Sequence, residues 1–361
     1  AVALGAVPAA DRPPLEEAPS GVGRARRIFG RSGLLPFLAR PGAPAAGATP
    51  APTGAAFREA RRIEIGHSHV TIAEPSPDGG SVLVVSEAEA RPRIHDLLSG
   101  RLLATFEVAG YVAFGRGDFV WWPAPSGPPR VLFAGEPGAV LLDPRDGRPL
   151  AALAVGPSWS ARPLGAHGVA LASYDLATQT SRLLLLEAQG PEQGEVALTL
   201  EFAERADDGA VSPDGRILYA LYYPSEQVEA IDLVARRVLF TAPAPRYGHT
   251  VDVSPDGELL AVGGAEVHLL SARDGSRLGT FTALGNNVHR VRFSPTGDVL
   301  AVTAYDGRAR LLSPRPVGGA LRLLGTLRHA GQANVYAAGF TAGGDHLVTS
   351  SGDRTVRVWR R

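Results

Sequence analysis

The stretch VSPDGELLAVGG, residues 253–264, contains the end of one apolar strand, a Ser-Pro-Asp-Gly turn and a second apolar strand. In such a turn Pro fixes one negative φ and Gly accepts a positive one, so the chain reverses its direction. The same pattern recurs as PSPDGGSVLVV from residue 75, VSPDGRILYAL from 211 and FSPTGDVLAVT from 293. Weaker copies are PSGPPRVLFAG from 125, LGAHGVALASY from 164 and FTAGGDHLVTS from 340. The chain is therefore built from repeats of one structural unit.

The spacing of these turns predicts seven units. The turn serine, or the residue in its place, falls at 76, 126, 165, 212, 254, 294 and 341. Residues 57–361 divided into seven parts give about 44 residues per part. This length fits the roughly 40–45 residues of a four-stranded propeller blade. In the second unit, FGRGD from residue 114 is an alternative position for the first turn.

Each unit is expected to hold four short strands. In the fifth unit they fall near 251–253, 259–262, 266–270 and 277–281, with turn residues between them. Short runs between turns are typical of β-structure and not of helices. One such sheet alone would leave two apolar faces in water, and radial packing of seven sheets buries them. The predicted fold class is all-β, a seven-bladed β-propeller of four-stranded antiparallel blades.

The two ends of the repeat region predict how the ring closes. The last unit stops soon after TVRVW, residues 355–359, and so lacks a fourth strand. The segment ARRIEIGH, residues 60–67, alternates Ile63 and Ile65 with polar residues and precedes the first unit. We therefore predict that residues 60–65 form the outer strand of the last blade.

Residues 1–56 are predicted to be an arm rich in Ala, Pro and Gly, separate from the propeller domain at 57–361. The arm lacks an alternating apolar pattern and cannot build a core. Its start, AVALGAVPAAD, is typical of the end of a secretory signal. We therefore expect a bacterial protein exported to the periplasm, with the cytoplasm as the alternative. GRARRIFGRSGLLPFLAR, residues 23–40, is either an unstructured linker or a docking segment for a partner or a membrane surface.

The last unit, GGDHLVTSSGDRTVRVWRR, carries a Ser-Gly-x-Asp turn followed by a tryptophan in its third strand. This pattern resembles the WD40 and YVTN-type β-propeller families, and the resemblance covers residues 57–361, although the Trp-Asp ending of WD40 repeats is absent. The Gly-His pair that opens such repeats is similar to Gly66-His67 and Gly248-His249, and His329 lies in a looser version. In the family, His, Ser or Thr, Asp and Trp form a structural hydrogen-bond network. The resemblance therefore implies structural roles for His67, His249, His329, Ser351, Asp353 and Trp359.

The composition argues against several kinds of chemistry. The 36 basic residues, all of them Arg, balance 36 acidic residues, and a net charge of zero disfavours nucleic-acid or anionic-membrane partners. The absence of Cys and Lys removes thiolate and Schiff-base catalysis. No apolar run is long enough to span a membrane. No P-loop, Gly-x-Ser-x-Gly or similar motif is present, so we predict no catalytic residue, no cofactor and no enzyme activity.

The histidines and paired aspartates have ordinary structural interpretations. His67 and His69 are two residues apart, and His249 and His289 occupy equivalent positions in two units. A metal site would need three or four converging ligands, and no acidic residue lies close to these histidines, so we interpret them as structural. Asp207-Asp208 is interpreted as part of a solvated loop.

Large side chains near the loops of one rim are the candidate binding residues. The connections between successive blades and those between second and third strands lie on this rim, and aromatic and Arg residues there can anchor a protein partner. The candidates are Trp159, Tyr222, Tyr223, Arg246, Tyr247, Asn287, Tyr305, Gln332, Asn334 and Tyr336. Trp121 and Trp122 are expected instead to pack between blades.

The predicted function is a non-catalytic scaffold that binds other proteins, as a subunit or assembly factor of a larger complex. It would use the loop rim and, as a second contact, the N-terminal arm. The alternative is an enzyme or redox-associated propeller, lactonase-like or dehydrogenase-associated, with its site at the mouth of the central channel. This alternative predicts His, Arg and acidic residues that converge at one mouth.

Overall fold

The computed structural model describes residues 25–30 and most of 57–361. The short gaps in the second range are 67, 87–88, 106, 109–116, 123–128, 136–137, 154, 156–157, 159, 164–167, 176–179, 190–192, 203–204, 224 and 332. Within the described residues the regular structure consists of β-strands and turns, which confirms the all-β fold class. These residues include no helix that is both long and apolar enough to cross a membrane.

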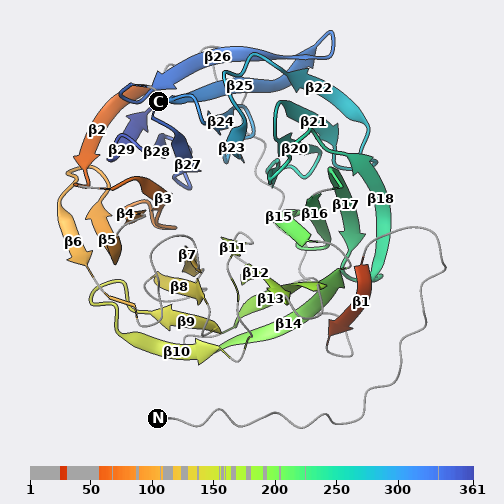
Figure 1. Cartoon of the computed structure of the whole chain (residues 1–361), viewed down its shortest axis with the longest axis horizontal. Coiled ribbons are helices and arrows are strands. Elements are labelled where there is room, and N and C mark those ends of the chain that lie inside the picture. Colours follow the sequence, from red (N-terminus) through yellow and green to blue (C-terminus); the bar gives the residue numbers. More distant parts are fainter. Residues whose placement is uncertain are drawn as a thin grey trace.

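The strands form antiparallel sheets arranged as blades around a central axis (Figure 1). Blade one contains β3 (Val70–Pro75), β4 (Ser81–Ser86), β5 (Glu89–Asp96) and β6 (Leu102–Thr105). Blade two contains β7 (Gly117–Trp122), β8 (Arg130–Gly135), β9 (Gly138–Leu142) and β10 (Pro149–Leu153). Blade three contains β11 (Ser160–Pro163), β12 (Gly168–Asp175), β13 (Thr180–Gln189) and β14 (Gln193–Phe202). Blade four contains β15 (Arg205–Val211), β16 (Ile217–Tyr223), β17 (Gln227–Asp232) and β18 (Arg237–Pro243).

An eight-stranded sheet follows, which consists of two four-stranded halves. Blade five is β19 (Thr250–Val253), β20 (Leu259–Gly263), β21 (Val267–Ser271) and β22 (Arg277–Phe281). Blade six is β23 (Val288–Phe293), β24 (Leu300–Ala304), β25 (Arg308–Val317) and β26 (Ala320–Arg328). The halves are joined by one parallel pair, Thr280 with Ala320. Divided at this pair, the sheets of the described residues give seven units. Six have four strands, and the sheet of blade three has β1 as a fifth strand beside β14.

The last blade is closed by a strand from the other end of the chain. Blade seven contains β27 (Val335–Phe340), β28 (His346–Ser351), β29 (Thr355–Arg360) and, on its outer edge, β2 (Arg58–Glu64). In the antiparallel register, Ile63 lies opposite Val356 and Arg61 opposite Val358. Ile63 is buried in one apolar cluster with Val356 and Val358. The predicted outer strand at residues 60–65 is therefore confirmed.

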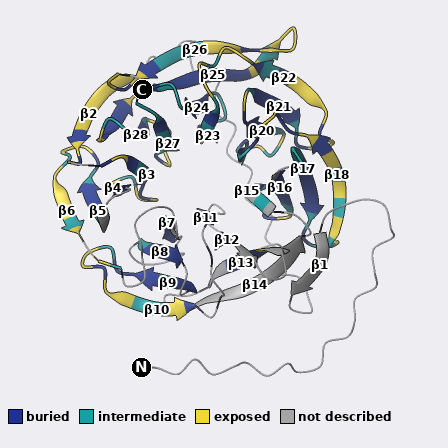
Figure 2. Ribbon diagram, in the orientation of Figure 1, coloured by how far each residue is buried: buried dark blue, intermediate teal, exposed yellow. Residues whose placement is uncertain are grey.

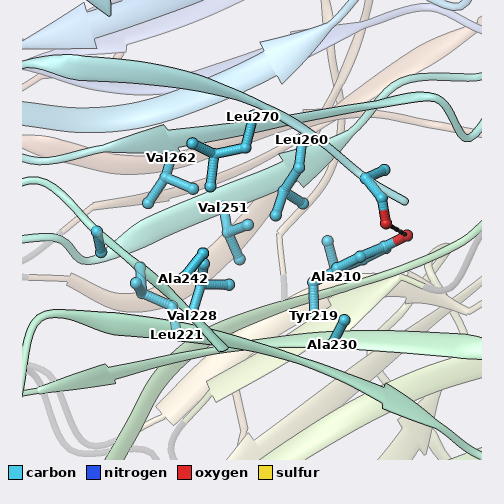
Figure 3. Packing of buried hydrophobic residues seen from close by; sticks show 12 residues of the cluster. Ala210, Tyr219, Leu221, Val228, Ala230, Ala242, Val251, Leu260, Val262 and Leu270 are labelled. Carbon is cyan, nitrogen blue, oxygen red and sulfur yellow. Dashed lines mark hydrogen bonds between the residues drawn. The ribbon is translucent and has the colours of Figure 1, made fainter. Parts of the chain in front are cut away.

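The apolar core is divided among the interfaces between neighbouring blades. Between blades four and five, Tyr219 and Leu221 pack against Val251, Leu260 and Val262 (Figure 3). Figure 2 shows that in the described part of the ring the second and third strands of the blades are mostly buried and the outer strands mostly exposed. Each blade thus needs both neighbours to cover its two faces.

The repeated turn is stabilised in the same way in several blades. In blade five the Ser254 hydroxyl donates to Asp256 Oδ1 at 2.5 Å and accepts from the Leu259 N–H at 2.9 Å. Gly257 has φ +76°, a left-handed value that residues with a Cβ atom disfavour. Ser76 and Ser212 make the same pair of side-chain bonds in blades one and four.

The strand positions decide the turn of the second unit and place one strand of the arm. In blade two the first turn lies between β7 and β8, so the alternative turn at FGRGD is wrong because Gly117 and Asp118 belong to β7. Within the arm, β1 (Ala25–Gly30) pairs antiparallel with β14 on the outside of blade three. The remainder of the arm lies outside the described residues.

Candidate protein-binding rim

Five aromatic rings gather at one mouth of the central channel, and we call them the ring cluster. His249, His289, Tyr336 and His69 belong to the inner strands of blades five, six, seven and one or directly precede them, and Tyr305 lies in a turn of blade six. The ring centroids of His289 lie 5.2 Å from those of both Tyr305 and Tyr336. His249 is 6.1 Å from His289, and His69 is 6.3 Å from Tyr336. The cluster therefore connects four consecutive blades.

The repeat places three of these rings at the same position in their units. His249, His289 and Tyr336 each stand five residues before the turn residue, which is Ser254, Ser294 or Thr341. At His289 and Tyr336 the pairing of the inner strand shifts register, between Val288 and Arg290 and between Val335 and Ala337. Such an irregularity redirects a side chain out of the regular alternation. The bulge thus explains why these rings are only half-buried at the channel mouth.

Hydrogen bonds position two rings of the cluster, one across a blade boundary and one within a blade. His249 Nε2 lies 2.6 Å from the Val288 carbonyl oxygen and links blade five to blade six. The Asn334 side-chain amide donates to the Tyr336 hydroxyl at 3.4 Å. Burial, together with the nearby Tyr336, raises the pKa of Tyr305. Tyr305 is therefore a neutral phenol at physiological pH.

Beside the ring cluster, Arg246 and Tyr247 form an exposed aromatic feature of this rim. Tyr247 is 47% exposed and has φ +54°, a strained value for a bulky residue. The Glu226 carboxylate accepts the Tyr247 N–H at 3.3 Å, and the Arg246 carbonyl accepts the Ala265 N–H at 2.7 Å. The Arg246 guanidinium lies 5.2 Å from the centre of the Tyr247 ring. The turn thus presents a tyrosine to solvent in a fixed position.

Other predicted rim residues are placed differently. The prediction that Tyr222 lies on the rim is wrong. Tyr222 is fully buried in β16, and its hydroxyl donates to Glu229 Oε2 at 3.1 Å. The alternation of β16 directs this ring into the core between blades three and four. Asn287 is half-buried. Trp159, Gln332 and the side chain of Tyr223 lie outside the described residues.

The positions of the rim histidines are relevant to the metal-binding and enzyme interpretations of the sequence. His69, His249 and His289 do lie in one cluster, as the enzyme alternative expects. Their ring neighbours in the cluster are tyrosines and, for His249 and His289, each other. Across the described part of the chain, no group of three or more His, Asp or Glu residues could hold a metal ion. His67 lies outside the described residues.

Blade seven contains a buried network of polar side chains. The Trp359 indole N–H donates to Thr349 Oγ1 at 2.8 Å, and Thr349 Oγ1 lies 2.8 Å from His329 Nε2. His329 Nδ1 lies 3.2 Å from both Asp353 oxygens. Burial lowers the pKa of His329, so the ring is neutral and its Nδ1–H donates to Asp353. Burial alone would raise the pKa of Asp353, but bonds from His329, the Ala330 N–H and Thr355 lower it overall.

Two residues of the predicted structural motif have other roles. Thr349, and not Ser351, bonds to His329 and Trp359, because Ser351 accepts the Asp353 N–H at 3.1 Å in the adjacent turn. His249 is not the equivalent of His329. It stands five residues before its turn residue, whereas His329 stands twelve before Thr341, so His249 belongs to the channel mouth.

Inner-strand carboxylates that join neighbouring blades were missed by sequence reasoning. Asp208 lies in β15 and is 6% exposed, which corrects its interpretation as part of a solvated loop. Its Oδ2 accepts the Val251 N–H of blade five at 3.1 Å. Asp118 Oδ2 similarly accepts the Ala161 N–H of blade three at 3.1 Å. The signal available in the sequence is an Asp within the apolar strand that precedes a turn. Trp121 and Trp122 are buried between blades, as predicted.

Comparison with known families identifies the repeat. Residues 275–312 and 321–360 match the WD40 family model, described as WD domain, G-beta repeat. The first match runs from just before β22 into β25, and the second runs from β26 to the end of β29. The chain therefore carries WD40 repeats over these two stretches, and the predicted WD40 resemblance is confirmed there. No curated protein matches the chain.

Proposed function

We propose that this protein is a non-catalytic platform that binds another protein through the rim formed by the ring cluster, Arg246 and Tyr247. WD40 repeats commonly mediate protein–protein interaction. The single observation that carries the proposal is the Arg246–Tyr247 turn, in which a strained backbone presents a half-exposed tyrosine. Tyr and Arg held in fixed positions lose little entropy on binding and dominate the energetics of many interfaces.

The ring cluster provides a surface around this tyrosine. His249, next to the Arg246–Tyr247 turn in sequence, extends the aromatic surface towards His289 and Tyr336. These rings are partly exposed. The bond from His249 to blade six and the bond from Asn334 to Tyr336 within blade seven hold two of them in place before a partner arrives. In many protein interfaces a central cluster of residues supplies most of the binding energy, and the peripheral contacts supply little. The platform would act as a subunit or assembly factor, with the N-terminal arm as a second contact and the periplasm as its location.

A photo-crosslinking amino acid at position 247, introduced in the source cells, tests the proposal. We expect a discrete protein adduct at 247 and none at 273, because Arg273 is exposed on the opposite rim. With the purified partner, the double variant Arg246→Ala/Tyr247→Ala should bind at least about thirtyfold more weakly, as expected for loss of a hot spot. Arg273→Ala is the matched control. Equal affinity of the double variant and the wild type would overturn the proposal.

The enzyme alternative is favoured by one observation, the convergence of three histidines at the channel mouth. It would replace the scaffold role if the purified protein turned over a lactone or reduced an electron acceptor and His289→Ala abolished that activity. A platform requires no turnover.

A further inference from the structure

The outer strand of blade three differs from the outer strands of the other blades. An exposed outer strand has unpaired backbone N–H and C=O groups and can pair with another chain. The outer strands of blades one, two and five are four or five residues long, and those of blades four, six and seven have seven to nine residues. β14 is ten residues long, and β1 covers the end of its outer edge. In Figure 1, β1 lies beside β14 on the outside of the ring.

The register of this pair is chemically matched. Arg27 lies opposite Glu201, and Ile28 lies opposite Leu200. Arg182 of β13 is opposite Glu201 on its other side, so the acidic position of β14 stands between two basic positions. Opposite charges and apolar pairs directly across neighbouring strands stabilise a sheet. The sequence of β14 carries no basic residue that would discourage strand addition.

The chain segment that connects β1 to the propeller domain is long. Residues 31–56 join β1 to Phe57, and β2 begins blade seven on the far side of the ring from β1 (Figure 1). An extended connection of this length can reach up to about 90 Å. Pairing of β1 with β14 is therefore not imposed by the neighbouring chain and depends on the match between the two strands.

We propose that the outer edge of β14 is a strand-binding site whose resident ligand is the chain's own residues 25–30. A free strand of the same chemistry, with a basic residue opposite Glu201 and an apolar residue opposite Leu200, competes for this edge. Recognition combines backbone pairing, which gives affinity, with the two matched positions, which fix the register.

Hydrogen exchange of the full-length protein, read by mass spectrometry, tests the resident strand. Amides in residues 25–30 should exchange more slowly than those of an unstructured peptide of the same sequence. Arg27→Gln or Glu201→Gln should each accelerate this exchange about two- to fivefold, as expected for one cross-strand charge pair. The double variant should be no faster than either single variant. Arg26→Gln is the control, because Arg26 falls in the register shift between Ala25 and Arg27 and is not opposite Glu201.

Competition tests the site itself. An excess of the synthetic peptide RARRIFGR, residues 24–31, should accelerate exchange in residues 25–30 of the protein while residues 198–202 stay protected. A scrambled peptide should change neither segment. Unprotected amides at 25–30 in the wild type would overturn the proposal. Additive effects of the two Gln substitutions would overturn recognition through the charge pair, and no response to RARRIFGR would overturn exchange of the strand.

Discussion

Blades six and seven match the same family model but are stabilised differently. Blade seven has the buried network of His329, Thr349, Asp353 and Trp359. At the same distances from the turn, blade six has Thr282, Val302, Asp306 and Leu312, and Val302 and Leu312 are fully buried in an apolar cluster. Both blades keep an Asp–Arg pair, Asp306 with Arg310 and Asp353 with Arg357.

The difference follows from how each blade is assembled. The strands of blade six are consecutive in sequence, and its hairpin reaches blade five where Gly279 leaves room for Pro316. Blade seven joins two distant chain segments, and Arg357 bonds to Glu59 of β2 across the junction at 2.8 Å. Directional polar contacts distinguish one register from another, whereas apolar packing tolerates small shifts. We infer that the polar network defines the register where the ring is closed.

The largest expected effect comes from replacing Trp359 of blade seven with leucine, the residue that blade six has at the equivalent position, 312. Trp359→Leu should lower the free energy of unfolding by about 2–4 kcal/mol, because it leaves a cavity and removes the hydrogen-bond donor to Thr349. Trp359→Phe keeps most of the ring and should cost about 1–2 kcal/mol. Urea unfolding followed by circular dichroism measures both. Wild-type stability of Trp359→Leu would show that the network does not stabilise the blade.

A smaller effect should appear as a pH dependence carried by blade seven. Because the folded pKa of His329 is lowered, the unfolded chain binds a proton near pH 6.5 that the folded chain excludes. The stabilising contribution is complete above that pH and is lost as the pH falls towards the folded pKa. Between pH 7 and 5.5 the wild type should lose about 1 kcal/mol more than His329→Gln.

Thermal melts at several pH values above 5 measure this difference, since the contribution of Asp353, whose pKa is also lowered, is lost only below about pH 4. Other histidines are common to both proteins and cancel. Parallel curves for the two proteins would contradict a neutral, buried His329.

The smallest difference between the two blades should appear at their turn glycines. Gly344 in blade seven and Gly297 in blade six occupy the same turn position with φ +71° and +69°. Replacing either with Ala should cost about 1–2 kcal/mol, because both changes place a Cβ in the left-handed region. Gly343→Ala, without such a φ and with only ordinary contacts, is the control. Melting temperatures that differ between Gly344→Ala and Gly297→Ala would show that the network also affects the turn.

The fold could be predicted because its determinants are local and repeated. The Ser-Pro-Asp-Gly turns determine where the chain reverses, and the alternation at Ile63 and Ile65 determines which side chains face the core. Neither depends on distant residues. The candidate binding rim was harder to predict. Tyr222 and Tyr247 are both near loops in the sequence, but strand alternation buries the first and a strained turn exposes the second. The sequence also assigned the hydroxyl group of the buried network to Ser351, whereas the structure has Thr349 there. Both residues belong to β28, so only their distances from His329 and Trp359 distinguish them.

The pairing of β2 with β29 also constrains the order of events during synthesis. Partners such as Glu59 and Trp359 leave the ribosome roughly 300 positions apart, so β2 must wait unpaired while all other blades emerge. Until then one face of blade one, with Val82 and Val84, has no neighbour. Completion of the circle is thus the last folding step, and the nascent chain is most open to chaperones and to misassociation just before it.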